Sequence, residues 1–205
     1  DAVVYLCCQA SYKYLPQHDD VFVQIAKQVP NAQFVFLPMN VLVARDLQKR
    51  LDRAFAAGGL DARDHCVVLR QMDRFSYWNL HLVADIFLDT IGWSGGVSTV
   101  EAISCRLPVV TLPRKLMRSN HTFAILTRIG ETETIARDKS DYSRIASRLG
   151  RDPAWRRQVA HRIAEGSPAL YSDPQCIAAL EDFFQQTHSA CSPALARPAE
   201  HGKNN

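Results

Sequence analysis

Five short apolar runs, separated by helical patterns, constrain the fold of this 205-residue chain more than any other feature. The runs are residues 3–7, 33–37, 66–69, 85–89 and 108–112. Each is apolar on both faces, which is typical of strands in a parallel sheet that helices cover on both sides. Strands that alternate with helices through short polar joints form right-handed βαβ units. We therefore expect an α/β fold with a doubly wound parallel sheet.

Amphipathic helical patterns fill most of the chain between and after these runs. Residues 19–29 and 41–57 carry apolar side chains at the spacing of one helix face, and Pro30 and Gly58 follow where these patterns end. Three more such helices are predicted after the fifth strand, at 140–149, 153–164 and 174–185. We expect these three helices to pack on the sheet and close the domain.

The chain therefore has room for one domain and a short appendage, in keeping with about 1.4 domains from its length. After Thr187 the sequence loses its periodicity and becomes rich in proline and polar residues. We predict one domain over residues 1–186 and a disordered tail over 187–205. Because the chain opens at Asp1, almost directly in a strand-like run, it resembles a piece of a longer protein.

Composition excludes several classes of protein. The net charge is only +3, from 24 basic and 21 acidic side chains without a long block of one sign, which gives no support to a nucleic-acid or membrane partner. No apolar run approaches the length of a membrane span. The six cysteines form no Cys-x-x-Cys pair and no zinc-like cluster with histidines. We expect reduced cysteines, no metal site and a cytoplasmic protein.

A loop rich in glycine and serine carries the main chemical signal. It follows the strand at 85–89, contains Gly95 and Gly96, and leads into a helix that begins near Ser98. Backbone N–H groups and the positive end of the helix dipole would then face the carboxyl edge of the sheet, where they suit a phosphate group. The spacing fits neither the dinucleotide fingerprint Gly-x-Gly-x-x-Gly nor a nucleoside-triphosphate P-loop.

Two local alternatives need no ligand. Ser98 and Glu101 have the spacing of a capping box, in which Ser98 caps the helix and Glu101 reaches back to its first N–H group. Glu101 is also placed to accept hydrogen bonds from ribose hydroxyls, and both interpretations remain open at this point. Asp89, at the end of a strand, favours a role in capping the following loop over a catalytic one.

Three segments together resemble a known family. They are Leu-Val-Ala-Asp-Ile-Phe-Leu-Asp-Thr at 82–90, Ser-Gly-Gly-Val-Ser-Thr-Val-Glu-Ala at 94–102 and Leu-Pro-Val-Val-Thr-Leu-Pro at 107–113. In this order and spacing, they look like the C-terminal catalytic half of the O-linked N-acetylglucosamine transferases and their SPINDLY relatives. The resemblance covers most of residues 3–186. It implies a GT-B glycosyltransferase, of which this chain would be the C-terminal, Rossmann-like, nucleotide-sugar-binding domain.

The resemblance assigns roles at the phosphate side of the site. It places the pyrophosphate-binding lysine, expected to act in catalysis, at Lys13, and the phosphate loop at Gly96, Val97 and Ser98, next to Gly95. Relatives carry His-Thr-Thr or Thr-Thr-Thr at the loop, so backbone donors would have to contribute more here. The family's glutamine is shifted by one position, at Gln9, because Ala10 stands in its place.

The resemblance also assigns the nucleoside side. It implies that Glu101 is the ribose carboxylate, that Met72 contacts uracil through its backbone and that Arg74 is a basic residue near the nucleoside. Tyr77 stands where relatives have a histidine, and its ring could stack on the base.

The implied function is transfer of N-acetylglucosamine from UDP-N-acetylglucosamine to serine or threonine of a protein. The reaction would be inverting, metal-independent and without a cofactor. The family recruits protein acceptors through an N-terminal half and tetratricopeptide repeats, neither of which this sequence contains, and the general base is expected in that half. Two alternatives are a GDP-fucose-dependent protein O-fucosyltransferase and a degenerate, non-catalytic nucleotide-sugar-binding module.

Overall fold

The computed structural model describes residues 2–38, 40–171 and 173–195, with side chains described as far as residue 190. Its strands are β1 (Val3–Cys7), β2 (Ala32–Phe36), β3 (Cys66–Val68), β4 (Ile86–Leu88) and β5 (Val109–Val110). They form one parallel sheet in the order β3-β2-β1-β4-β5. The doubly wound α/β fold predicted from the sequence is thus confirmed. The strand order reverses between β1 and β4, which makes this position the switch point of the sheet. Ligand binding is expected there, at the carboxyl ends of these two strands.

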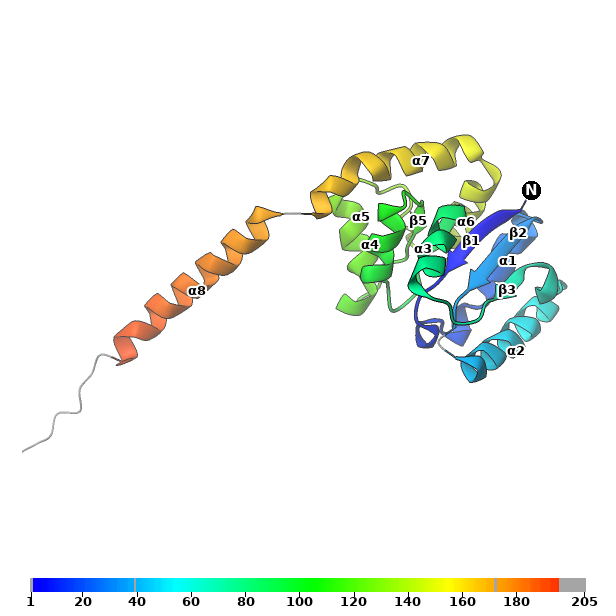
Figure 1. Cartoon of the computed structure of the whole chain (residues 1–205), viewed down its shortest axis with the longest axis horizontal. Helices are drawn as coiled ribbons and strands as arrows, with labels where there is room; N and C mark the ends of the chain where they lie inside the picture. Colours follow the sequence, from blue (N-terminus) through cyan, green and yellow to red (C-terminus); the bar gives the residue numbers. More distant parts are fainter. Residues whose placement is uncertain (1, 39, 172, 196–205) are drawn as a thin grey trace, which may run out of the picture. The chain divides into compact units, whose positions relative to one another are not determined.

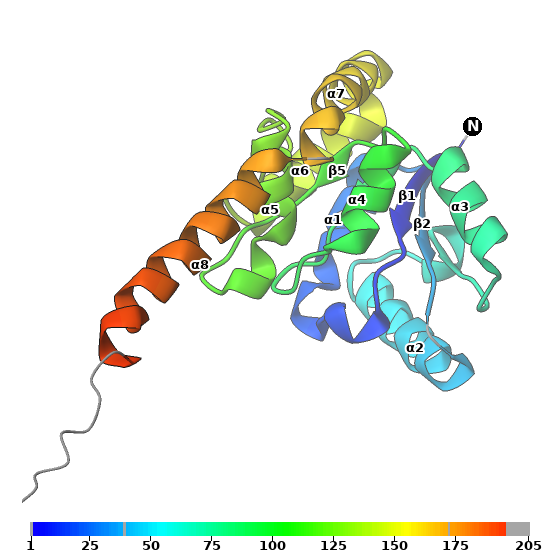
Figure 2. The same cartoon turned by 60° about the vertical axis from the view of Figure 1, so that its left-hand side comes forward.

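Helices connect and cover the strands (Figure 1). They are α1 (Asp20–Gln28), α2 (Val41–Ala57), α3 (Arg74–Val83), α4 (Val97–Ser104), α5 (His121–Arg128), α6 (Lys139–Arg151) and α7 (Pro153–Gly166). Short 3₁₀ turns are η1 (Ser11–Lys13), η2 (Pro16–His18), η3 (Ala62–Asp64), η4 (Met117–Ser119) and η5 (Ser167–Leu170). Helix α6 packs on α1 and reaches β4 and β5. In the view of Figure 2, β1 is seen between α3 and α4.

The core is built around aromatic side chains of the two central strands. Tyr5 and Phe34 are fully buried with ring centroids 5.2 Å apart, and Phe22 of α1 meets Phe36 at 5.1 Å. The Tyr5 hydroxyl donates to the carbonyl of Ala146 at 3.0 Å, which fixes α6 against β1. Each such buried ring stabilises the fold by about 1.5–3 kcal/mol through its apolar area.

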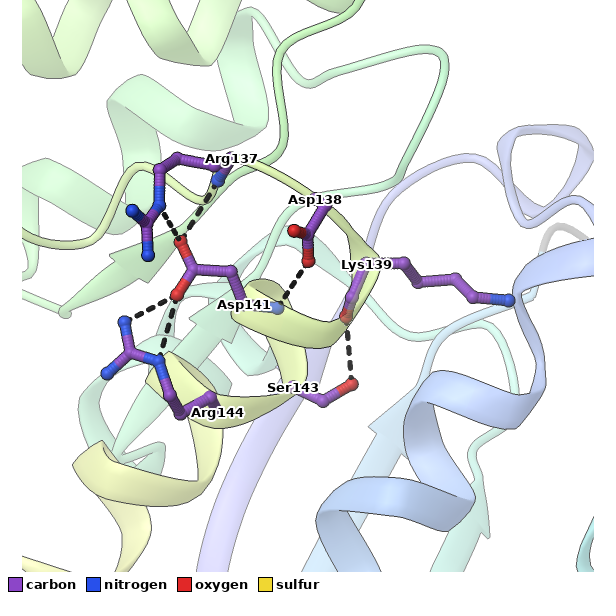
Figure 3. A network of polar contacts seen from close by, with 6 residues as sticks. All are labelled: Arg137, Asp138, Lys139, Asp141, Ser143 and Arg144. Carbon is purple, nitrogen blue, oxygen red and sulfur yellow. Dashed lines mark hydrogen bonds and ion pairs between the residues drawn. The ribbon is translucent and has the colours of Figure 1, made fainter.

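A polar network fixes the start of α6 (Figure 3). Asp138 is the N-cap and accepts from the N–H of Asp141 at 2.8 Å. The buried carboxylate of Asp141 lies between two guanidinium groups, those of Arg137 and Arg144, with the Nε of Arg144 at 2.9 Å. These two hydrogen-bonded ion pairs hold the pKa of Asp141 below its ordinary value, although burial opposes them.

The same turn also joins α6 to the neighbouring elements. Lys139 extends away from the rest of the network, as Figure 3 shows, and its ammonium group donates to Asp20 of α1 at 2.8 Å. Tyr142, one turn further on, is buried and donates from its hydroxyl to the carbonyl of Asp89 at 2.8 Å. The start of α6 therefore supports the strand end at which the candidate site lies.

The C-terminal part differs from the prediction. The first compact unit ends at Pro168, not at 186, and the last helix, α8, runs over Pro174–Leu195 in a second unit. Residues 187–195 of the expected tail are therefore helical, and residues 196–205 lie outside the described residues. The apolar side chains that we expected on one face of this helix are Ile177, Leu180, Phe183 and Phe184, and all four lie within α8. Their spacing correctly predicts a helix, but helical spacing alone does not tell which surface, if any, an apolar face covers.

Two further predictions concern cysteines and membranes. Cys7, Cys8 and Cys66 are free and buried, as expected of cysteines that serve as small apolar side chains. Of the helices that the structure describes, none is long and apolar enough to cross a membrane.

Candidate functional site

The carboxylate of Asp89, directly after β4, joins three chain segments at the carboxyl edge of the sheet. It accepts from the side-chain amide of Gln9 at 2.6 Å, the N–H of Gly95 at 2.7 Å and the hydroxyl of Thr111 at 2.6 Å. Burial raises the pKa of Asp89, although these donors oppose the shift. Asp89 thus caps the loop that follows it, as predicted from its place at the end of a strand.

Gln9 forms hydrogen bonds with the start of this loop. Its amide nitrogen binds Asp89, its amide oxygen accepts from the hydroxyl of Thr90, and the residue is only 2% exposed. A ligand contact, as the family resemblance implies, would have to compete with these bonds. In the structure, Gln9 supports the loop between β4 and α4.

Lys13, in the 3₁₀ turn after β1, contacts the same loop between β4 and α4. Its ammonium group donates to the carbonyl of Ser94 at 3.0 Å and lies 5.8 Å from the ring centre of Trp93. The guanidinium group of Arg118 lies over the same ring at 5.2 Å. Partial burial lowers the pKa of Lys13, and the charge of Asp89 opposes this shift. Lys13 is therefore in contact with the segment that leads to the predicted phosphate-binding residues.

The first turn of α4 presents backbone donors. Gly96 is the N-cap without a side-chain cap, and Val97 is 76% exposed. Among the described residues, no protein group accepts from the N–H groups of Gly96, Val97 and Ser98. Gly95 must be a glycine for space, because a Cβ there would lie 2.5 Å from the Thr99 hydroxyl. This turn has the donors and the dipole to bind an anion, provided that a ligand brings one.

The capping-box interpretation is wrong. Helix α4 begins at Val97, so Ser98 is its second residue and does not cap it. Glu101 does not reach back to the helix start; its carboxylate accepts from the hydroxyl of Tyr77 on α3 at 2.7 Å. The local pattern was misleading because a side chain from another helix supplies the better donor.

Ser94 joins this loop to a second helix. Its hydroxyl accepts from the N–H of His121, the first residue of α5, at 3.0 Å, and its own N–H donates to the carbonyl of Arg118 at 2.9 Å. The ring of His121 lies close to Gly96, since a Cβ on that glycine would be 3.9 Å from Nδ1. The sequence analysis missed Ser94, and no local signal relates it to a helix 27 residues later.

The nucleoside side of the predicted site is only partly assembled. Tyr77 and Glu101 are in contact, and Cys8 and the fully buried His81 lie next to them. Met72 and Arg74 form no hydrogen bond or ion pair with the loop at 89–96 within the described chain. Met72 is half-buried and Arg74 is exposed at the start of α3.

The described residues also contain no group of three or more histidine, cysteine, aspartate or glutamate side chains that could hold a metal ion. The site offers instead a lysine, a neighbouring arginine and the first turn of a helix as positive groups.

The family follows from a comparison of sequences. Residues 1–170 match the sequence profile of glycosyl transferase family 41. The chain belongs to this family. The UDP-N-acetylglucosamine–peptide N-acetylglucosaminyltransferase of Caenorhabditis elegans is 24% identical over 207 aligned residues, which cover 100% of this chain and 17% of that protein. A probable SPINDLY enzyme of Hordeum vulgare is 24% identical over 90% of this chain and 20% of its own length.

Solved structures agree with this assignment. An O-GlcNAc transferase mutant of Thermobaculum terrenum superimposes with a TM-score of 0.81 and 25% identity, over 94% of this chain and 37% of that one. The C-terminal domain of a group 1 glycosyl transferase from Francisella tularensis gives a TM-score of 0.63 at 14% identity, over 83% of this chain and 86% of that one. The fold is thus that of the C-terminal domain of GT-B glycosyltransferases, as predicted. The family 41 chain described here spans about a sixth to a fifth of the curated relatives' length.

Proposed function

We propose that this family 41 domain binds the nucleotide-sugar donor of a protein O-glycosyltransferase, with UDP-N-acetylglucosamine as the donor. The observation that carries the proposal is the contact between Lys13 and Ser94 at 3.0 Å, beside the free N–H groups of the first turn of α4. A lysine ammonium group and a helix N-terminus together suit a diphosphate. The similarity to O-GlcNAc transferases supports the choice of donor.

In the proposed reaction, the hydroxyl oxygen of an acceptor serine or threonine attacks the anomeric carbon and inverts it. The bond between that carbon and the diphosphate oxygen breaks, UDP leaves with the bonding electrons, and the hydroxyl proton goes to a general base. Lys13 and the N–H groups of residues 96–98 would stabilise the charge that develops on the leaving diphosphate. The proposal needs no metal, because these groups supply the positive charge, and it assigns no base to this chain.

On the nucleoside side, Glu101 would accept from ribose hydroxyls, and Met72, Arg74 and Tyr77 would lie near the base. Gly95 and Gly96 let the backbone approach the phosphates. Gln9 would act by holding the loop in place. A protein acceptor and tetratricopeptide repeats belong to this proposal through the family alone, as does a cytoplasmic location.

A calorimetric titration of the chain with UDP and with GDP tests the nucleotide. We expect saturable binding of UDP at least tenfold tighter than that of GDP. The reverse preference would favour the fucosyltransferase alternative, which the similarity to SPINDLY proteins supports. Binding of neither nucleotide would refute the proposed function.

A transfer assay separates binding from catalysis. We expect the 205-residue chain alone to bind UDP weakly and to transfer no sugar to a protein acceptor. Transfer by this chain alone would refute the assignment of the base to another part of the enzyme.

A further inference from the structure

The hydrogen bond between Tyr77 and Glu101 connects two helices at the switch point of the sheet. Tyr77 lies in the first turns of α3, Glu101 lies one turn into α4, and the two side chains meet at 2.7 Å. Both residues are half-buried. Cys8, the first residue after β1, approaches the Tyr77 hydroxyl at 3.7 Å. The pair therefore lies at the carboxyl end of β1, where a doubly wound fold binds its ligand.

The surroundings of Tyr77 hold its ring in one place. The ring of His81, one turn later on α3 and fully buried, meets it edge-on at 4.8 Å between centroids. His81 Nδ1 lies 3.0 Å from the carbonyl of Tyr77, and its Nε2 lies 3.7 Å from the Cys8 sulfur. A side chain fixed by such contacts loses little further freedom when it forms a hydrogen bond.

The direction of the Tyr77–Glu101 bond is also determined. Burial raises the pKa of Tyr77 well above its ordinary value, and the bond to Glu101 adds to this, so the hydroxyl keeps its proton. Burial raises the pKa of Cys8 to about 12, so the thiol is neutral and a weaker acceptor than a carboxylate. Tyr77 therefore donates its hydroxyl hydrogen to Oε2 of Glu101.

This bond occupies one oxygen of the carboxylate and leaves the other available. Oε2 of Glu101 accepts from Tyr77, whereas Oε1 has no hydrogen-bond partner among the described residues. A carboxylate held through one oxygen presents the second oxygen in a fixed direction. A glutamate side chain without such a hydrogen bond would instead have to lose rotamer freedom when it binds a ligand.

We propose that Tyr77 is a positioning residue that fixes Glu101, so that the free carboxylate oxygen accepts a hydrogen bond from a ribose hydroxyl of the nucleotide. This inference rests on the proposed function, because it needs a nucleotide in the site. It assigns to Tyr77 a role that differs from stacking on the base. The role depends on the tyrosine hydroxyl, which a histidine at this position would not supply.

The test is a calorimetric titration of the wild-type chain and of Tyr77→Phe with UDP and with 2′,3′-dideoxy-UDP, which lacks both ribose hydroxyls. We expect the substitution to weaken UDP binding by about fivefold to tenfold, the effect of one lost hydrogen bond. Binding of the dideoxy nucleotide should change less than about twofold, since Glu101 has no ribose hydroxyl to accept from there.

Two controls accompany the test. Tyr12→Phe removes a hydroxyl from an exposed tyrosine that packs edge-on against Trp93, and it should change neither affinity. In a Glu101→Gln background, Tyr77→Phe should no longer affect the preference for UDP over 2′,3′-dideoxy-UDP, because the carboxylate that Tyr77 orients is gone. This double-mutant cycle remains informative if Tyr77→Phe lowers the melting temperature, because it compares two nucleotides on the same variant.

Each outcome has one meaning. If Tyr77→Phe loses the same affinity for both nucleotides, Tyr77 has a merely structural role. If Tyr77→Phe binds UDP as tightly as the wild-type chain or more tightly, Tyr77 does not prepare Glu101. Either result overturns the inference. If the wild-type chain binds UDP and discriminates against the dideoxy form but Tyr77→Phe does so equally well, the inference alone fails. If the wild-type chain binds neither nucleotide, the proposed function fails and the inference with it.

Discussion

The loop between β4 and α4 and the loop between β3 and α3 leave the same edge of the sheet, but the protein holds them in different ways. Asp89, Thr90 and Ser94 of the first loop are buried and bonded to residues after β1 and β5. Residues 69–73 of the second loop are exposed or half-buried. Asp73, for example, uses its carboxylate to cap its own helix at Ser76.

This difference teaches how the binding energy should be distributed. The groups proposed for the diphosphate are in place before any ligand arrives, so little ordering is needed when it binds. The groups proposed for the base, Met72 and Arg74, form no bonds to the first loop within the described residues and have to be ordered on binding. We expect substitutions on the diphosphate side to have the larger effects.

Lys13→Ala should have the largest effect. Removing a charged donor to a phosphate should weaken UDP binding by about 10-fold to 100-fold, because a hydrogen bond to a charged group contributes about 1.5–3 kcal/mol. Isothermal titration calorimetry measures this loss. Lys139→Ala is a control, because the ammonium group of that lysine is also held by the protein, in an ion pair with Asp20 of α1 away from the candidate site. Unchanged affinity in Lys13→Ala would contradict the comparison and favour the degenerate, non-catalytic alternative.

Gly95→Ala should come next, because it disturbs the ordered loop from within. The new methyl group would lie 2.6 Å from the Gln9 amide and 2.7 Å from the Ser98 hydroxyl. We expect a loss of about 1–3 kcal/mol in the free energy of unfolding, as for other overpacked sites. Chemical denaturation measures it. Gly96→Ala is the neighbouring control, since its nearest contact would be an ordinary 3.9 Å and its φ is negative. Equal losses in the two variants would show that the loop is not tightly packed at Gly95.

The pH dependence of UDP binding should show the partial burial of Lys13. Because burial lowers the pKa of this lysine, the free protein loses the proton at a lower pH than an exposed lysine would. UDP affinity should therefore be full at neutral pH and fall as the pH rises through this lowered value. Titrations between about pH 7 and 10 measure the profile, with Lys13→Arg expected to keep its affinity over this range because arginine stays protonated. Identical profiles would mean that Lys13 does not contact the diphosphate.

Arg74→Ala should have the smallest effect. Its side chain is exposed and forms no hydrogen bond or ion pair within the described chain, so stability should change by less than about 0.5 kcal/mol. We expect UDP binding to weaken about twofold to threefold, as for an exposed charge, and pyrophosphate binding to stay unchanged. Competition titrations with both ligands measure this. A loss as large as that of Lys13→Ala would show that the nucleoside side is as well prepared as the diphosphate side.

The fold could be predicted almost completely where the sequence signal is local. The predicted bounds of β1 and α2 match the structure to the residue, because continuous apolar runs and a helical face end at clear boundaries. The signal fails at α8, which continues through the proline and polar residues after Thr187 as far as Leu195. Which surface the apolar face of α8 covers is also not a local property of the sequence.

The candidate site was predictable in part for the same reason. Glycines after a buried strand and the family resemblance indicated the loop and Lys13. The bonds that hold this loop join residues far apart in the sequence, such as Gln9 to Asp89 and Ser94 to His121. The pairing of Glu101 with Tyr77 likewise depends on how α3 and α4 pack, which no spacing along the chain reveals.

The shared carboxylate of Asp89 has a consequence for motion. One side chain ties the segment after β1, through Gln9, to the segment after β5, through Thr111, and to the loop backbone at Gly95. Displacing any one of these segments would break a hydrogen bond to a buried charge, at a cost of about 1.5–3 kcal/mol. The three segments should therefore shift as one rigid body. Among the described residues, the loop at 69–73 has no such connection to Asp89. Any closing of the site around its ligand is then left to this loop, which would move toward the fixed residues proposed to bind the diphosphate.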